Sequence, residues 1–259
     1  MKKVLALLPI VFLLILSFSV SKMVSMKYKS AKEYEVSERP IQSDAAEQNV
    51  SETVSSDDED AEPVYNAFCD ELSKENNDFA GWLSIDGTNI DYPLMMSPDN
   101  PDYYLKRDFY KKESVSGTPY IGKDCTLESD NAVIYGHNME NGTMFSDLML
   151  FKSEEFCKEH SKVLIQTVNE NAEYDIVAVF KEKVHYQDES NVFRYYDYAG
   201  DLSSEDFDKY VSTIKGISLY DTGITAKYGD KLISLSTCSH LSKNGRFVIV
   251  AVKHSSPKN

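Results

Sequence analysis

The sequence predicts a mainly β domain, an antiparallel barrel or sandwich that also carries two helices. Three observations lead to this fold class. Short runs of β-branched, aromatic and other apolar residues follow one another, separated by Gly, Pro, Asn and Asp. One run near the C-terminus alternates between an apolar face and a small hydroxylated face, as a half-buried strand does. Two other stretches repeat apolar residues at the spacing of an amphipathic helix.

The first predicted helix covers residues 65–77, where Phe68 and Leu72 lie on one stripe with Cys69 beside them. The second covers residues 203–215. Serine at its start can cap the helix, and the acidic residues that follow favour the positive end of the helix dipole. Its apolar stripe consists of Phe207, Tyr210, Val211 and Ile214.

The predicted strands lie between and after these helices. Their periodicity gives no sign of an internal repeat. We expect strands at residues 82–85, 89–92, 119–121, 131–135, 162–167, 174–183, 232–238 and 246–252.

Residues 1–24 are predicted to form either a membrane signal-anchor or a cleavable signal peptide. Residues 4–20 carry no charge and are almost wholly apolar. A helix of this length spans about 25 Å, near the lower limit for a bilayer core of about 30 Å, and Lys22 can snorkel if the span is longer. Small residues at 17–21 also suit cleavage, so a removable signal peptide is the alternative. Lysines on both sides of the span leave its orientation open.

Residues 25–63 are predicted to form an acidic, disordered linker. Between Pro40 and Pro63 there are eight acidic residues and no Lys or Arg, about half of the chain's formal net charge of −15. Such a segment repels itself and has little to bury. The overall acidity argues against nucleic-acid binding. The predicted folded domain then covers residues 64–253, long enough for one sizeable core, and residues 254–259 are a tail.

A cysteine and an arginine lie at the same end of one predicted hairpin. Cys238 ends the run of residues 232–238, and Arg246 begins the run of residues 246–252. The intervening turn ends in Asn-Gly, a strong hairpin signal. Positive charge near a thiol favours the nucleophilic thiolate, so the hairpin is a candidate active site. A buried structural cysteine is the alternative interpretation.

The strand that ends at Cys238 has two different faces. Ile233, Leu235 and Thr237 form a face suited to a core. Ser234, Ser236 and Cys238 form the other, which we expect to be the floor of a cleft.

His137 is the candidate proton carrier. It follows the predicted strand 131–135 and Gly136, which breaks the strand and presents the histidine at the edge of the sheet. A Cys/His pair about a hundred residues apart can meet only through the fold. His240, two residues past Cys238, is a competitor, although it is expected to point away along the turn. We expect structural or solvent-exposed roles for His160, His185 and His254.

The four cysteines lack the spacing of metal ligands, so no zinc site, and no cofactor, is predicted. An extracytoplasmic location permits disulfides, but bridging Cys238 would abolish the proposed chemistry. We therefore expect Cys69, Cys125, Cys157 and Cys238 all to be reduced, with Cys69 and Cys157 packed against helical neighbours.

Three segments resemble the sortase family. Residues 234–238, Ser-Leu-Ser-Thr-Cys, resemble the signature Thr-Leu-X-Thr-Cys, with Ser234 replacing the first Thr. Residues 133–139 resemble the histidine segment, and residues 245–250 resemble the arginine strand. The order His, Cys, Arg is more specific than any single motif.

Further segments are similar to class B sortases in particular. The resemblance covers roughly residues 65–253. It implies a closed antiparallel or mixed sortase-type β-barrel with an N-terminal helix and a helix in the long connection before the cysteine strand. Any acidic fourth helper is in doubt, because the nearest acid after the run at 117–121 is Asp124. The segments similar to class B are residues 81–93, 99–105 and 144–148.

The resemblance implies a membrane-anchored cysteine transpeptidase with His137, Cys238 and Arg246 as catalytic residues. It implies cleavage of a C-terminal Pro-X-Thr-type sorting signal after Thr, followed by transfer to a peptidoglycan precursor amine of the lipid II type. It further implies a single-pass cell-membrane protein whose catalytic domain is extracytoplasmic. Leu105 and Ser236 align with substrate-binding positions of the family.

Other functions remain as alternatives. An L,D-transpeptidase also pairs Cys, His and Arg, but there the Arg follows the Cys almost at once, whereas here it is eight positions on. A papain-like secreted peptidase places its Cys before its His and at the start of a helix. A non-catalytic anchored binding module would keep the hairpin as a structural element only.

Overall fold

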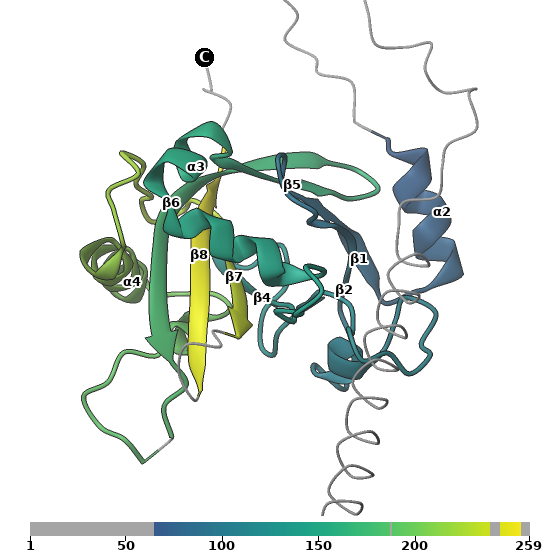
Figure 1. Cartoon of the computed structure of the whole chain (residues 1–259), viewed down its shortest axis with the longest axis horizontal. Helices are drawn as coiled ribbons and strands as arrows, with labels where there is room; N and C mark the ends of the chain where they lie inside the picture. The colour runs from purple at the N-terminus through teal and green to yellow at the C-terminus, as the bar shows by residue number, and fades with distance from the viewer. Residues whose placement is uncertain (1–64, 187, 239–243, 255–259) are drawn as a thin grey trace, which may run out of the picture.

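A computed structural model describes residues 65–186, 188–238 and 244–254. Strands in this part of the chain close into a barrel in the order β1-β2-β3-β4-β7-β8-β6-β5, which confirms the predicted mainly β class (Figure 1). The strands are β1 Phe79–Ser84, β2 Asp91–Met95, β3 Tyr120–Ile121, β4 Asn131–Tyr135, β5 Lys162–Gln166, β6 Asn171–Lys183, β7 Leu232–Cys238 and β8 Gly245–Lys253.

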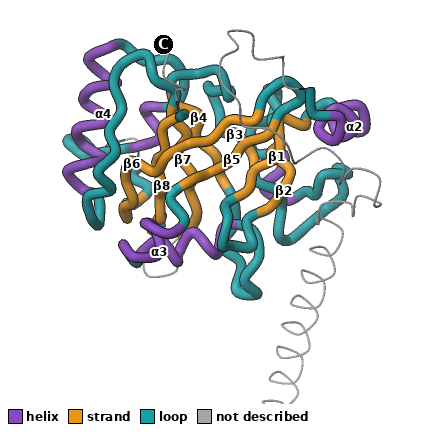
Figure 2. The backbone as a smooth tube through the Cα atoms, turned by 90° about the horizontal axis from the view of Figure 1, so that it is seen from above, coloured by secondary structure: helices purple, strands orange, loops and turns teal. Residues whose placement is uncertain are grey.

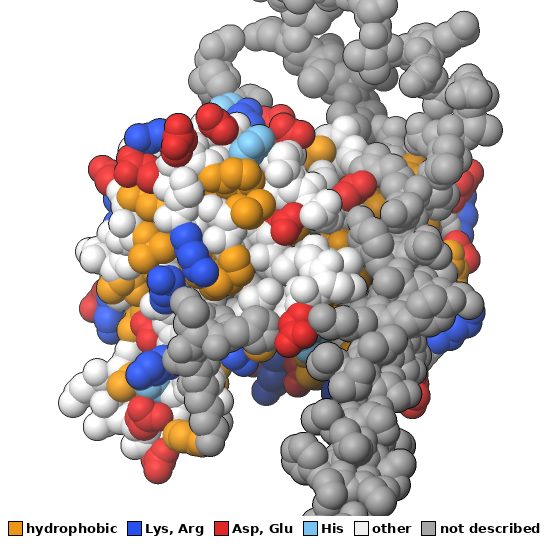
Figure 3. All heavy atoms as spheres, in the orientation of Figure 1, with side chains coloured by type: hydrophobic (Ala, Val, Ile, Leu, Met, Phe, Trp, Pro, Cys, Tyr) orange, Lys and Arg blue, Asp and Glu red, His pale blue; other side chains and the backbone are white. Residues whose placement is uncertain are grey.

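Helices pack around the barrel. Figure 2 shows α2 and α4 on opposite sides of it, beside β1 and β6 respectively. Basic and acidic side chains are interspersed over the face seen in Figure 3. The α-helices are α2 Ala67–Glu75, α3 Glu154–Glu159 and α4 Ser204–Ile217, and the 3-10 helices are η1 Tyr103–Lys106, η2 Phe145–Lys152 and η3 Tyr195–Tyr198.

The barrel is mixed, because two of its ladders are parallel. β2 pairs with β3 in parallel, and β4 pairs with β7 in parallel from Asn131 opposite Leu232 to Tyr135 opposite Ser236. Parallel neighbours need a long crossover. Between β4 and β7 that crossover holds η2, α3, β5, β6, η3 and α4. The cysteine strand β7 is thereby inserted between the histidine strand β4 and the arginine strand β8.

The main core is formed by apolar residues of the strands, such as Ile134, Leu235 and Ile249, each fully buried. These three residues are paired across β4, β7 and β8, so they share one face of the sheet. A smaller cluster lies beneath α2 and includes Trp82 and Tyr104. The core therefore makes β4, β7 and β8 a rigid platform for the residues at their ends.

The two predicted helices form as the periodicity indicated. Ser203 caps α4, because its Oγ accepts a hydrogen bond of 3.1 Å from the N–H of Asp206. The predicted stripe of Phe207, Tyr210, Val211 and Ile214 is buried. Helix α2 begins at Ala67, two residues later than predicted, because Asn66 caps it through a hydrogen bond from the N–H of Cys69.

Three short helices were not predicted: η1, η2 and η3. None is long enough to repeat an apolar stripe, so the spacing signal is absent. Strands β4 and β7 match their predicted bounds. Strand β6 begins at Asn171 rather than residue 174, because pairing with β5 continues to that residue.

One finding contradicts the expected single-pass cell-membrane location. Within residues 65–186, 188–238 and 244–254, every helix lacks the length or the apolar character that a membrane crossing requires. The segments predicted as anchor and linker, residues 1–24 and 25–63, lie outside the described residues, as does most of the predicted tail.

Candidate active site

Cys238 and Arg246 are paired across the hairpin of β7 and β8. The antiparallel register places Cys238 directly opposite Arg246, and Ser236 opposite Val248. Directly opposed residues of an antiparallel pair project from the same face with their Cβ atoms about 5 Å apart. Both residues are half-buried. The thiol and the guanidinium therefore share one face and one end of the barrel.

His137 lies beside this pair because β4 runs parallel to β7. The last paired residues are Tyr135 and Ser236, and His137 and Cys238 each lie two residues further along. Steps of two residues preserve the face on which a side chain lies in an extended chain. The structure thus brings the predicted histidine, cysteine and arginine to neighbouring positions. His240, the competing histidine, lies outside the described residues.

Gly136 has a packing role at this point. A Cβ atom built on Gly136 would lie 2.5 Å from the ring of Phe145, in η2. The N–H of Phe145 also donates a hydrogen bond of 2.8 Å to the carbonyl of His137. Glycine is therefore required for the close approach of η2, which turns the chain away from β7 after His137.

The imidazole of His137 is held by the connection between β2 and β3. Its Nε2 atom lies 2.8 Å from the main-chain oxygen of Leu105. Since a carbonyl only accepts, Nε2 carries the proton of this hydrogen bond, and Nδ1 is the proton acceptor of the neutral ring. This orienting partner is a main-chain group, which residue spacing could not reveal.

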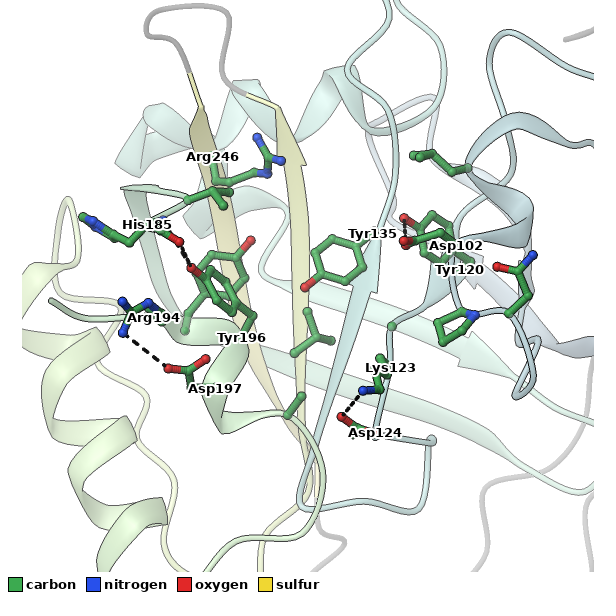
Figure 4. Close-up of a pocket in the computed structure, with 18 residues that line it drawn as sticks. Asp102, Tyr120, Lys123, Asp124, Tyr135, His185, Arg194, Tyr196, Asp197 and Arg246 are labelled. Carbon is green, nitrogen blue, oxygen red and sulfur yellow. Dashed lines mark hydrogen bonds and ion pairs between the residues drawn. The ribbon is translucent and has the colours of Figure 1, made fainter. Parts of the chain in front are cut away.

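A cavity of about 910 Å³ extends away from this end of the barrel. Figure 4 shows Arg246 near one end of it and Lys123 and Asp124 near the other. Val133 and Tyr135 of β4 line it, together with Leu105 of η1 and Tyr196 of η3. His137 and Cys238 do not themselves line the cavity, but His137 is hydrogen-bonded to the lining residue Leu105, and Cys238 is paired with the lining residue Arg246. The cavity is therefore a groove that leads to the candidate catalytic residues.

The two predicted substrate-binding residues differ in their placement. Leu105 is half-buried and lines the groove. Ser236 is only 1% exposed, and its hydroxyl forms a hydrogen bond of 2.7 Å with the hydroxyl of Tyr195. Ser236 thus lies beneath Tyr195, which itself lines the groove.

The hydroxylated face of β7 is covered, contrary to the expectation that it forms an open floor. Ser234 is buried, and its hydroxyl contacts the hydroxyl of Tyr210, in α4, at 2.8 Å and Oδ1 of Asn131 at 2.9 Å. Tyr195 covers Ser236 in the same way. The serines are small because tyrosines of the crossover pack over them, and Cys238 is the position on this face that stays partly exposed.

Three tyrosines surround the Arg246 end of the groove. Burial raises the pKa of Tyr120, Tyr135 and Tyr195 above its usual value. The positive charge of Arg246 opposes the rise at each of them, because it favours the phenolate. These phenols are therefore neutral near pH 7, and they line the site as uncharged hydrogen-bonding groups.

The remaining cysteines differ from Cys238 in exposure. All four are free thiols, and Cys69, Cys125 and Cys157 are buried, whereas Cys238 is half-buried. Burial also raises the pKa of the Cys125 and Cys157 thiols. Among the described residues, no cluster of three or more His, Cys, Asp or Glu side chains could hold a metal ion.

His185 has a role that the sequence did not indicate, because it lines the groove. Its Nδ1 lies 2.9 Å from Oε2 of Glu189, and its Nε2 lies 3.3 Å from Oε1 of Glu182. The Glu189 hydrogen bond, and then that of Glu182, raise the pKa of His185 against the opposing effect of desolvation. A local signal existed, since the two carboxylates lie three and four residues away in sequence.

Comparisons with known proteins agree with this fold. A family model described as the sortase domain matches residues 83–254. Sortase B of Listeria monocytogenes is 33% identical over 183 residues, which cover 69% of this chain and 71% of that protein. The structure of Clostridium perfringens sortase B matches with a TM-score of 0.64 and 32% identity, over 72% of this chain and 99% of that one.

A Staphylococcus aureus sortase B–substrate complex matches with a TM-score of 0.64 over 73% of this chain and 85% of that one. At 21% identity this match shows a likeness of fold alone.

A barrel that brings a Cys–Arg hairpin beside a histidine strand, together with a family match over most of the chain, defines the class: the chain belongs to the sortase family. Within that family its relatives are sortase B proteins, so it is of class B. It is accordingly a cysteine transpeptidase of the cell envelope.

Proposed function

We propose that the protein cleaves a C-terminal Pro-X-Thr-type sorting signal after its Thr and joins the released carbonyl to a cell-wall amine through a thioester on Cys238. The observation that carries the proposal is the register of β7 and β8, in which Cys238 lies opposite Arg246 at one end of the groove. Family membership supports the same chemistry.

The first half of the proposed reaction forms the thioester. The Cys238 thiolate attacks the Thr carbonyl carbon, and electrons move onto the carbonyl oxygen. Arg246, with its fixed donor fork, stabilises that oxyanion. As the C–N bond breaks, imidazolium His137 gives a proton to the leaving amine.

The second half releases the product. The acceptor amine attacks the thioester carbonyl and loses a proton to His137, which now acts as a base. The C–S bond breaks and regenerates the Cys238 thiolate. The hydrogen bond from Nε2 to Leu105 supports Nδ1 as the atom that exchanges this proton.

The groove supports a peptide as the substrate. It combines apolar and aromatic side chains such as Leu105 and Tyr196 with charged ones such as Asp102 and Arg194. A peptide in extended form presents both side chains and main-chain hydrogen-bonding groups to such a lining. The proposed acceptor is a peptidoglycan precursor amine of the lipid II type, for which triglycine serves as a soluble test compound.

The test uses the purified full chain with peptides of the form Leu/Asn/Ser-Pro-X-Thr-Gly/Asn, with and without triglycine, followed by mass spectrometry. The expected result is a Thr–triglycine amide product that requires the amine and disappears in Cys238→Ala. Hydrolysis of the peptide to the same extent with and without triglycine would indicate a cysteine peptidase instead. Peptide binding without any turnover would indicate a binding module, and an active Cys238→Ala variant would refute the proposed nucleophile.

A further inference from the structure

The contact between β4 and β7 continues past their last paired residues through side chains. After Tyr135 and Ser236 one more main-chain bond forms, from the N–H of Gly136 to the oxygen of Ser236 at 3.2 Å. Beyond it, Oγ1 of Thr237 donates to the oxygen of Gly136 at 2.8 Å. Nδ2 of Asn138 then donates to the oxygen of Cys238 at 2.9 Å.

These two side-chain hydrogen bonds are reciprocal. One donor belongs to β7 and reaches the chain that follows β4, and the other belongs to that chain and reaches β7. They occur where η2 draws the chain away from β7, since the carbonyl of His137 is bonded to Phe145. Side chains longer than a main-chain N–H can therefore maintain the contact where the regular ladder ends.

We propose that Asn138 is a positioning residue for the reaction: its amide holds the main chain of Cys238 in register with His137. The hydroxyl of Thr237, in β7, restrains the main chain of Gly136 in the opposite direction. The inference rests on the proposed function of Cys238 and His137. Asn138 is adjacent to His137 in sequence, so one short segment both supplies the imidazole and restrains the thiol-bearing residue.

The position of Cys238 needs such a restraint because Cys238 is the last residue of β7. Pairing with Arg246 in β8 orders it on one side. The Asn138 amide orders it on the side of β4. A displacement of about 1 Å in a reacting group costs about 100-fold in rate, so loss of the second restraint affects catalysis more than folding.

The variants are chosen so that shape and donor capacity change separately. Asn138→Ala removes the side chain, and Asn138→Asp keeps its size but replaces the donor with an acceptor. Thr237→Val removes the second donor from a residue that is 2% exposed, whereas Thr237→Ser keeps a hydroxyl. The matched control is Asn89→Ala, which removes an amide, between β1 and β2, whose Nδ2 donates a hydrogen bond of 2.8 Å to Asp147 in η2.

The full chain and its variants are assayed for transfer to triglycine and for alkylation of Cys238 by iodoacetamide. Cys238 reports cleanly because the other three cysteines are buried. We expect Asn138→Ala and Asn138→Asp to lower kcat by about 10- to 100-fold, with KM changed less than about twofold. The rate at which iodoacetamide alkylates Cys238 should differ from the wild-type rate in both variants. Thr237→Val should behave similarly and Thr237→Ser should retain activity, as should Asn89→Ala.

Wild-type kcat in Asn138→Asp would overturn the inference. A second result would also overturn it: a lowered melting temperature together with an unchanged kcat, where kcat is calculated per Cys238 thiol that iodoacetamide can alkylate. That result would describe a purely structural residue. If Asn138→Ala does not fold, the Thr237→Val and Thr237→Ser pair decides the question by the same criteria. Full activity of Cys238→Ala would instead refute the proposed function, so the two failures are distinguishable.

Discussion

The imidazole of His137 is hydrogen-bonded, through Nε2, to the main-chain oxygen of Leu105 at a distance of 2.8 Å. The histidine follows β4, and its partner belongs to η1, in the connection between β2 and β3. Gly117 lies against the same carbonyl, because a Cβ atom built there would be 2.6 Å from the Leu105 oxygen. The orientation of His137 therefore depends on the absence of a side chain at residue 117.

Gly117→Ala should lower transfer activity by displacing the Leu105 carbonyl. The φ of Gly117 is +60°, so alanine also adds strain of about 1–2 kcal/mol. Gly223→Ala is the matched control, since its φ is +76° and nothing lies within 4 Å of its added Cβ. We expect both variants to lose stability in denaturant unfolding, Gly117→Ala more than Gly223→Ala because its Cβ also meets main-chain oxygen. Only Gly117→Ala should lose kcat, by about tenfold. Equal kcat in both would contradict the role of the Leu105 carbonyl.

Removing either hydroxyl of the Tyr195–Ser236 pair should destabilise the fold. Each single variant, Tyr195→Phe or Ser236→Ala, leaves one buried hydroxyl without its 2.7 Å partner, at a cost of about 1–3 kcal/mol. The double variant should be less destabilised than the sum, which a double-mutant cycle in denaturant measures.

Asp130 should make stability depend on acidic pH. Burial alone would raise its pKa, but hydrogen bonds from the N–H of Leu202 and from Lys231 outweigh burial and lower the pKa below 3.8. Because the folded-state pKa is depressed, the stabilisation is complete above about pH 4 and is lost as pH falls through the folded value. Asp130→Asn should cost about 1 kcal/mol at pH 7 and less at pH 3.

The measurement is chemical unfolding of both proteins across this pH range. Asp208→Asn, on the exposed face of α4, is the control and should leave the profile unchanged. If the unfolding free energy of Asp130→Asn depended on pH as that of the wild type does, the contacts of Asp130 with Lys231 and Leu202 would not contribute to stability.

His185 should titrate above its ordinary pKa of 6.5, since the hydrogen bond that its imidazole donates to the Glu189 carboxylate raises that pKa. A raised pKa means that the ion pairs with Glu189 and Glu182 stabilise the groove wall fully below pH 6.5. That contribution is lost as pH rises through the folded value. NMR titration of the imidazole should give a lower pKa in Glu189→Gln than in the wild type, and no change in Glu205→Gln.

Local patterns predicted several elements accurately. The stripe of α4, its Ser203 cap and the bounds of β4 and β7 depend on residues near one another in sequence. The Cys–Arg hairpin was also predictable, because a turn signal joins two strand-like runs. The short helices η1 and η3, which form walls of the groove, were missed because four residues carry no periodicity.

The sequence by itself determined the mainly β class, the two principal helices, the hairpin that pairs Cys238 with Arg246, and the histidine that ends a strand. Only the tertiary structure decided that β4 runs parallel to β7, that Tyr195 covers Ser236, and that Leu105 and Asn138 hold the site through main-chain oxygens. The physical reason is that strand periodicity and turn chemistry act over a few residues. Pairing across a crossover of about a hundred residues is selected by burial of the whole core, and main-chain acceptors are the same in every residue.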